Sequence, residues 1–202
     1  MIRLIRNWVS LGVAVFLLTA CSRTVEWEEE VPLNTGEIIW VKRSIQYSLQ
    51  GGAGNPLDVA WRPKKEQVLD FSWNGKGYRY EGGACLQVLA IRDGMPVLIG
   101  NAWCQSLQWT HNYDPCERYV QLFPRSTKGW DWLIHPEDWV YGLDTNLAID
   151  FSHIERFKSG RITASERDEY KTKDPRGISQ TRIVKPDPYN FENVKCRKED
   201  KK

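Results

Sequence analysis

The chain has 202 residues, with 28 Lys and Arg against 26 Asp and Glu and a formal net charge of +2. The first twenty residues hold two of the basic residues and none of the acidic ones, so the remaining chain carries 26 of each and is formally neutral. A neutral chain without a basic field gives no argument for nucleic-acid binding. It is long enough for one domain with a hydrophobic core.

The N-terminal segment has the layout of a secretory signal peptide. Arg3 and Arg6 form a basic start without acids, and an apolar run from Trp8 to Thr19 follows, interrupted only by Ser10 and Gly12. The run is shorter than the roughly 20 apolar residues that a membrane-spanning helix needs, and no later run approaches that length. We therefore expect no membrane span in the mature protein.

The end of this segment resembles the bacterial lipobox, because Leu17-Leu18-Thr19-Ala20-Cys21 places leucine three residues before the cysteine and small residues between. The resemblance implies that residues 1–20 are removed as a signal peptide, that the Cys21 sulfur receives a diacylglyceryl group and that the freed amine is acylated. Acyl chains such as palmitate hold a protein stably on a membrane when there are two or more. The alternative is an ordinary signal peptide that leaves Cys21 as a free or disulfide-bonded thiol.

The residue after the cysteine bears on the choice of membrane. In enterobacteria-like lipoproteins an aspartate there favours retention in the inner membrane, and this chain has Ser22. The resemblance implies an outer-membrane lipoprotein that faces the periplasm, with the periplasmic face of the inner membrane as the alternative.

Residues 21–36 are predicted to be a lipidated N-terminus and an acidic tether, since they are rich in glutamate and contain Pro32 and Gly36. About fifteen extended residues reach on the order of 50 Å, so we expect the domain to stand clear of the bilayer. The segment Val31-Pro32-Leu33-Asn34-Thr35-Gly36-Glu37 resembles one in uncharacterised lipoproteins of proteobacteria. That likeness implies a tether followed by a β domain, and it implies no activity.

Residues 37–202 are predicted to form a single β-rich domain. A β-branched and aromatic run spans 37–49 and ends at the glycine-rich stretch 51–56. Residues 68–73 and 78–80 flank Asn74-Gly75, a strong hairpin signal. Further strands are predicted at 84–92, 96–103, 118–123 and 147–151. This tight spacing favours an antiparallel β-sandwich or a small barrel.

Two helical patterns interrupt the strands. Pro136–Tyr141 has proline and acids in a first turn and Gly142 as a stop, which predicts one short helix. Thr163-Ala164-Ser165-Glu166 is a capping-box pattern that opens a polar helix to about Lys173. The remaining C-terminal residues are punctuated by proline and predict an irregular tail.

Four further cysteines, Cys85, Cys104, Cys116 and Cys196, predict two disulfides in an oxidising compartment. Sequence alone leaves three pairings open. A four-residue loop at Asp93–Pro96 would place Cys85 directly opposite Cys104, which would leave Cys116 to pair with Cys196. The main competitor joins Cys104 to Cys116 across a short loop.

Aromatic residues are the candidate ligand-binding groups. Exposed tryptophans stack on sugars or anchor protein interfaces, although aromatic residues in strands are more often core. The candidates concentrate in one third of the chain and are Trp103, Trp109, His111, Trp130, Trp132 and Trp139.

A catalytic or metal site is not predicted, and neither is a cofactor. The candidate ligands are His111, Asp114, His135, Glu137, Asp138 and His153. The histidines lack helical metal-ligand spacing, and the acids at 137 and 138 fit a helix start. Gly51-Gly52-Ala53-Gly54 lacks the strand-loop-helix context of a phosphate-binding loop.

These features favour a non-enzymatic binding protein for a protein partner in the cell envelope, and this class includes an immunity-type inhibitor that meets a toxin in the periplasm. The alternative is a peptidoglycan- or glycan-binding module that uses exposed tryptophans. A hydrolase using His111 or His135 is the least favoured hypothesis.

Overall fold

The computed structural model describes residues 22–52, 55–101, 119–126, 129–147, 160–173, 182–183 and 185. The chain divides into two compact units: residues 1–25 with 45–64 form the first, and residues 26–44 with 65–202 form the second. Three long strands, β1 (Ser22–Pro32), β2 (Ile38–Gly52) and β3 (Asn55–Trp73), contribute residues to both units.

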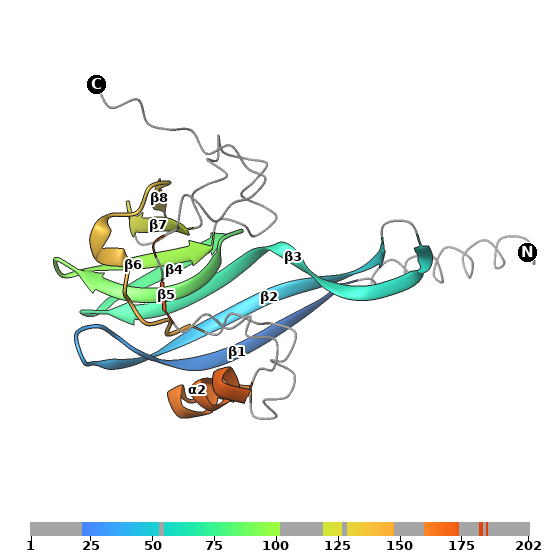
Figure 1. Cartoon of the computed structure of the whole chain (residues 1–202), viewed down its shortest axis with the longest axis horizontal. Coiled ribbons are helices and arrows are strands. Elements are labelled where there is room, and N and C mark those ends of the chain that lie inside the picture. The colour runs from blue at the N-terminus through green and yellow to red at the C-terminus, as the bar shows by residue number, and fades with distance from the viewer. Residues whose placement is uncertain are drawn as a thin grey trace, which may run out of the picture. The chain divides into compact units, whose positions relative to one another are not determined.

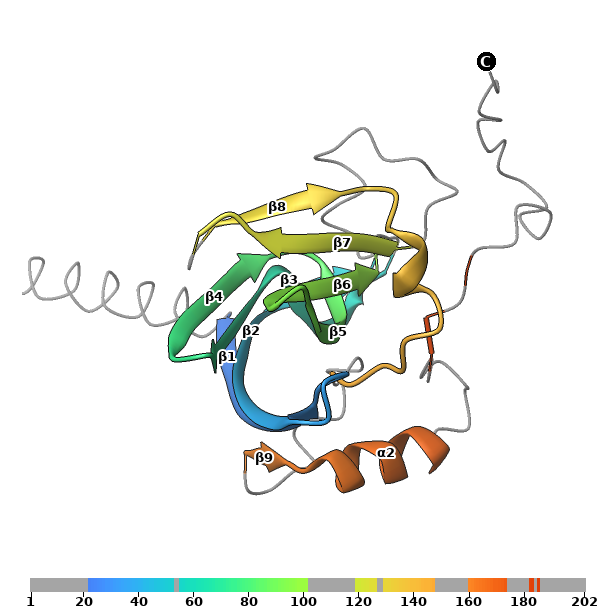
Figure 2. The ribbon, with the colours of Figure 1, turned by 90° about the vertical axis from the view of Figure 1, so that its left-hand side faces the viewer.

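The strands of the described residues form two sheets, which Figures 1 and 2 show from two sides. The first sheet has the order β4-β3-β2-β1-β9, where β4 is Lys76–Gly82 and β9 is Arg161–Ile162. In this sheet β9 runs parallel to β1 and β4 runs antiparallel to β3.

The second sheet has the order β5-β6-β7-β8, and all its neighbouring strands are antiparallel. Its strands are β5 (Cys85–Arg92), β6 (Met95–Asn101), β7 (Tyr119–Pro124) and β8 (Trp130–Leu133). The predicted mainly β fold is therefore confirmed as two open sheets, and the described strands close no barrel.

The main core lies in the second unit and draws buried side chains from both sheets. Successive side chains of a strand point to opposite faces. Strand β2 follows this rule, because buried Val41 and Arg43 alternate with exposed Trp40 and Lys42. The buried residues of this cluster are Val31, Leu33, Val41, Leu69, Phe71, Trp73, Tyr80, Ala84, Leu86, Leu89, Ile91, Leu98, Val120, Leu122 and Leu147.

A second cluster covers other residues of the four-stranded sheet. Its buried members are Val88, Ala90, Val97, Ile99, Tyr119, Val140 and Ile183. Val140 belongs to a 3-10 helix, η1 (Asp138–Val140), and Ile183 to the C-terminal segment. Strand β5 contributes to both clusters, which explains why Leu86 to Ile91 are buried without interruption.

Two-residue turns join β3 to β4 and β5 to β6. Both turns have positive φ at their two residues: 48° and 72° at Asn74 and Gly75, and 51° and 74° at Asp93 and Gly94. This is the primed turn that matches strand twist. The predicted Asn74-Gly75 hairpin is confirmed.

The predicted four-residue loop at Asp93–Pro96 is wrong, because Met95 and Pro96 already belong to β6. The shorter turn and an irregularity between Leu86 and Val88 place Asn101 opposite Cys85. The register therefore removes the argument for direct opposition of Cys85 and Cys104. Cys85 is the only cysteine of the described residues and is disulfide-bonded; the pairing stays a prediction.

The predicted acidic tether differs from the structure, because residues 22–32 form strand β1. Trp27, Glu29 and Val31 alternate inward and are buried. The burial of Glu29 is stabilised by Arg43, whose Nη1 donates to the Glu29 carboxylate at 2.7 Å. Because Glu29 is charged although it faces inward, the segment lacks the apolar–polar alternation that usually indicates a strand. Its sequence alone therefore suggests a tether.

Both helical predictions are confirmed. The first is the single turn η1, which is followed by Gly142 at φ 100°. The second is α2 (Ala164–Lys173), and its capping box is complete. The Glu166 amide donates to Thr163 Oγ1 at 3.2 Å and the Thr163 amide donates to the Glu166 carboxylate at 2.8 Å. The Thr163 amide and the Thr163 hydroxyl both donate to the Glu166 carboxylate, and these two hydrogen bonds lower the pKa of Glu166.

Candidate functional site

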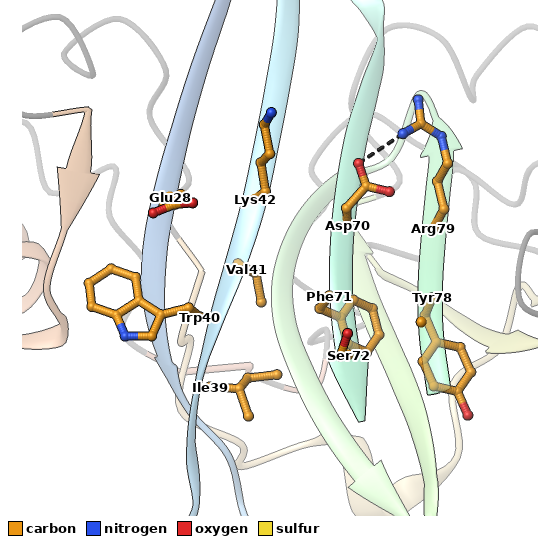
Figure 3. Close-up of a pocket in the computed structure, with 11 residues that line it drawn as sticks. Glu28, Ile39, Trp40, Val41, Lys42, Asp70, Phe71, Ser72, Tyr78 and Arg79 are labelled. Atoms are coloured by element: carbon orange, nitrogen blue, oxygen red, sulfur yellow. Dashed lines mark hydrogen bonds and ion pairs between the residues drawn. The ribbon is translucent and has the colours of Figure 1, made fainter. Parts of the chain in front are cut away.

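A pocket of about 760 Å³ lies between β2 and β3 in the second unit, and Figure 3 shows its lining. Its volume falls within the range of about 300–1,000 Å³ that is usual for ligand sites. We call it the β2–β3 pocket. Strand β1 contributes Glu28 to the lining, and β4 contributes Gly77, Tyr78 and Arg79.

The pocket is lined by both faces of its two central strands. On β2, Val41 points to the core and Lys42 to the opposite face, and both line the pocket. On β3, Phe71 points inward and Ser72 outward, and again both line it. Because opposite faces of a paired sheet do not share a cavity, we infer that β2 and β3 diverge here. Figure 3 shows this divergence.

Core aromatic rings form one wall of the pocket. Phe71 and Tyr78 are stacked, with ring centroids 5.3 Å apart and planes inclined by 17°. Trp130 of β8 lies behind them, 6.5 Å from the Phe71 centroid, and its indole Nε1 donates to the Arg79 carbonyl at 2.8 Å. These contacts fix the wall from the side of the core, so an apolar surface faces the opening.

Charged side chains of both signs stand around the opening. Asp70 accepts from Arg79 at 2.8 Å across β3 and β4, and Arg79 also lies 3.5 Å from Glu81. Glu28 accepts from Arg161 of β9 at 2.8 Å. The rim therefore carries donors and acceptors beside an apolar wall, a combination that orients a bound group through polar contacts.

An exposed apolar patch on β2 adjoins the pocket, and one of its two residues, Trp40, also lines the pocket. Ile38 is 59% exposed and Trp40 is 43% exposed, and their spacing of two residues places them on one face. The Arg161 guanidinium lies 5.0 Å from the centre of the Trp40 ring. We call Ile38 and Trp40 the outer patch. Sequence reasoning missed this patch, because Trp40 belongs to a β-branched and aromatic run whose side chains could equally well be buried in a core.

The predicted tryptophan candidates are engaged in packing where the structure describes them. Trp130 and Trp132 are partly buried against the cluster between the sheets. Trp139 packs against the second cluster, donates to Glu137 at 2.6 Å and has Arg92 5.5 Å above its ring. Trp103, Trp109 and His111 lie outside the described residues, and so do Cys21, Cys104, Cys116 and Cys196.

The acidic residues considered for acid–base chemistry hold local structure. Glu137 accepts from Gln121 at 2.9 Å, and this hydrogen bond, followed by the one from Trp139, lowers the pKa of Glu137. Lys185 donates to Asp138 at 2.8 Å and lowers the pKa of Asp138. His135 is exposed beside them. Asp114 and His153 lie outside the described residues.

A second pocket, of about 580 Å³, lies where β5, the residues after η1 and α2 meet. The polar groups that line it join these elements to one another. Arg167 of α2 is buried, and its Nη1 donates to the Glu30 carbonyl at 2.8 Å and to the Asn146 carbonyl at 2.6 Å. Through these hydrogen bonds Arg167 attaches α2 to the rest of the second unit. Since this polar group already has a structural role, the β2–β3 pocket is the stronger candidate site.

Within the described part of the chain, no group of three or more His, Cys, Asp or Glu residues is placed to hold a metal ion. No helix among the described residues is long and apolar enough to cross a membrane. No protein-family model, no curated protein and no solved structure matches the chain.

Proposed function

We propose that this chain is a lipid-anchored, non-enzymatic binding protein of the bacterial cell envelope, and that its partner is another envelope protein bound at the β2–β3 pocket and the outer patch. Cys21 carries the lipid, and the domain faces the periplasm from the outer membrane. The observation that carries the proposal is an aromatic-walled pocket adjoining exposed Ile38 and Trp40.

The composition of the site supports a protein partner. Trp and Arg are enriched among the residues that contribute most to protein interfaces, and here Trp40 lies against Arg161. Exposed Ile38 extends the apolar area beyond the lining of the pocket. Apolar area outside a pocket is what a protein partner covers, whereas a small ligand would be confined to the pocket itself. The mixed charges of the rim would select a partner surface with the complementary arrangement.

The compartment is consistent with this proposal. The resemblance of residues 17–21 to a lipobox and the signal-peptide layout support a location of the mature chain outside the cytoplasm. Cysteine pairing is expected there, and Cys85 is disulfide-bonded.

Site-specific photo-crosslinking in living cells tests the proposal. A photoreactive phenylalanine analogue is introduced in place of Trp40, and in a control chain in place of Met95. Met95 is 53% exposed and follows the β5–β6 turn, so it matches the exposure of Trp40 away from the pocket. We expect a reproducible protein adduct from position 40 and none from position 95.

Two results would contradict the proposal. Position 40 could give no protein adduct, or positions 40 and 95 could give the same one. An adduct that disappears after digestion with a peptidoglycan hydrolase would contradict the protein partner and support the glycan alternative. Asp70→Lys, which reverses one rim charge, should reduce a genuine adduct from position 40.

A further inference from the structure

Strand β1 begins at Ser22, directly after the cysteine that the lipobox assigns to lipidation. Consecutive Cα atoms are 3.8 Å apart, so the Cα of Arg23 lies within about 8 Å of the Cα of Cys21 in any conformation. If Cys21 carries the lipid, as the proposed function requires, the first structural unit starts at the surface of the bilayer.

Arg23, two residues after Cys21, lies beside two aromatic rings of the first unit. The Arg23 guanidinium lies 4.9 Å from the centre of the Trp61 ring and 5.5 Å from that of Tyr47. Trp61 is 38% exposed. Leu49 is 42% exposed and follows Tyr47 by two residues, so it lies on the same face of β2. We call Arg23, Leu49 and Trp61 the anchor-side patch.

This composition is the one that proteins use at membrane surfaces. Tryptophan prefers the level of the lipid headgroups, where its ring is half in an apolar and half in a polar environment. Arginine places its apolar stem along such a surface and keeps its charge in water. The positive charge of Arg23 suits anionic headgroups.

We propose that the anchor-side patch lies on the same phospholipid bilayer that holds the Cys21 lipid, with Leu49 and Trp61 at the level of the headgroups. The bilayer is the occupant because the lipid chain brings its surface to within two residues of the patch. The domain is thus held against the membrane by a protein surface as well as by its acyl chains.

Fluorescence quenching of the lipidated protein tests this inference. The protein is reconstituted in vesicles of phosphatidylethanolamine and phosphatidylglycerol, with or without bromine on the acyl chains near the glycerol. Bromine quenches only those tryptophans that reach the bilayer. The variants are Trp61→Phe and, as a matched control, Trp40→Phe, because Trp40 is similarly exposed at 43% but belongs to the second unit.

We expect bromine to quench the wild-type protein and Trp61→Phe to lose most of that quenching, whereas Trp40→Phe retains it. Leu49→Gln, which keeps every tryptophan, should also reduce quenching. Equal quenching of wild type and Trp61→Phe would overturn the inference, and so would a loss in Trp40→Phe as large as in Trp61→Phe. Sedimentation with the vesicles is checked first: a wild-type protein that stays in solution contradicts the proposed lipidation itself.

Discussion

Glu29 and Arg43 form an ion pair whose side chains have no exposed surface. The two charges are 2.7 Å apart, and Arg43 also donates to Gln67 at 3.0 Å. Removal of one partner of a buried pair leaves an uncompensated charge, which costs about 3–5 kcal/mol. We therefore expect Glu29→Ala to lower the free energy of unfolding by about that amount in urea titrations.

The matched control is Glu26→Ala on the same strand. Glu26 pairs with Lys42 at 3.3 Å, but both side chains are more than half exposed. An exposed pair contributes about 0–1 kcal/mol, so this variant should unfold close to the wild type. Equal midpoints for the two variants would show that the buried pair contributes no more than the exposed one.

Tyr80 makes the stability of the fold depend on pH in the alkaline range. Burial raises the pKa of Tyr80 to about 12, although its hydrogen bond from the Ala84 amide acts in the opposite direction. An unfolded tyrosine loses its proton near pH 10. The folded state therefore retains a proton that the unfolded state releases, and the stability due to Tyr80 is present below pH 10 and is lost as the pH rises through about 12.

Above pH 10, we therefore expect the free energy of unfolding to fall more steeply with pH in the wild type than in Tyr80→Phe. One proton bound only by the folded state corresponds to a slope of about 1.4 kcal/mol per pH unit. Urea titrations at several values above pH 10 should show this difference, after both proteins are normalised at neutral pH. Parallel curves for the two proteins would contradict the assignment to Tyr80.

Strand β5 is an edge of its sheet, and two asparagine side chains bond to its backbone. Asn146 accepts from the Leu89 amide at 2.8 Å and donates to the Leu89 carbonyl at 2.7 Å. Asn34 makes the same pair of bonds with Ile91, at 2.7 and 2.9 Å. The side-chain amides thus form hydrogen bonds with backbone groups of the edge strand that would otherwise be open to pairing with other chains.

Asn146→Asp separates the roles of this amide. The carboxylate can still accept from the Leu89 amide but repels the carbonyls of Leu89 and Pro32, to which Asn146 donates. We expect a loss of about 1–3 kcal/mol or more, because buried acceptors lose their donor, together with increased aggregation in light scattering. Asn34→Asp, at an exposed position with the same bonds, should lose less. A smaller loss for Asn146→Asp than for Asn34→Asp would refute the edge-protection role.

Local signals predicted local elements well. Asn74-Gly75 and the Thr163–Glu166 capping box each depend on a few neighbouring residues, and both are confirmed. Strand β1 was missed because Glu29 occupies an inward position that only Arg43, fourteen residues later, makes tolerable. Strand β9 was missed for a similar reason, since its two residues become a strand only by pairing with β1.

For the whole molecule, the sequence predicted a mainly β fold, either a sandwich or a small barrel, but not the opening between β2 and β3. That opening depends on how far two strands of one sheet diverge, which no periodicity records. The roles of the tryptophans were equally hard to predict. Trp130 supports the pocket wall through its hydrogen bond to the Arg79 carbonyl, whereas Trp40 is exposed. Exposure is set by neighbouring layers, so composition could identify aromatic residues but not their roles.

The presence of strand β1 in place of a tether also changes the expected distance between the fold and the membrane. A flexible tether would have kept the domain away from the membrane, and the anchor would then determine only the location of the protein. If Cys21 is lipidated as proposed, a strand that starts at Ser22 joins the lipid directly to the fold. The proposals then assign separate tasks to two surfaces: the β2–β3 pocket would bind a protein partner, and the anchor-side patch would contact the bilayer.

Lipidation of Cys21 is the central claim, because the compartment, the partner class and the anchor-side patch all depend on it. Intact-mass measurement of the protein extracted from membranes tests it most directly. We predict a chain that begins at Cys21 and carries the added mass of a diacylglyceryl group and an N-linked acyl chain, and an unprocessed chain for Cys21→Ala. A mature chain with an unmodified Cys21, or one cut at another position, would contradict the account.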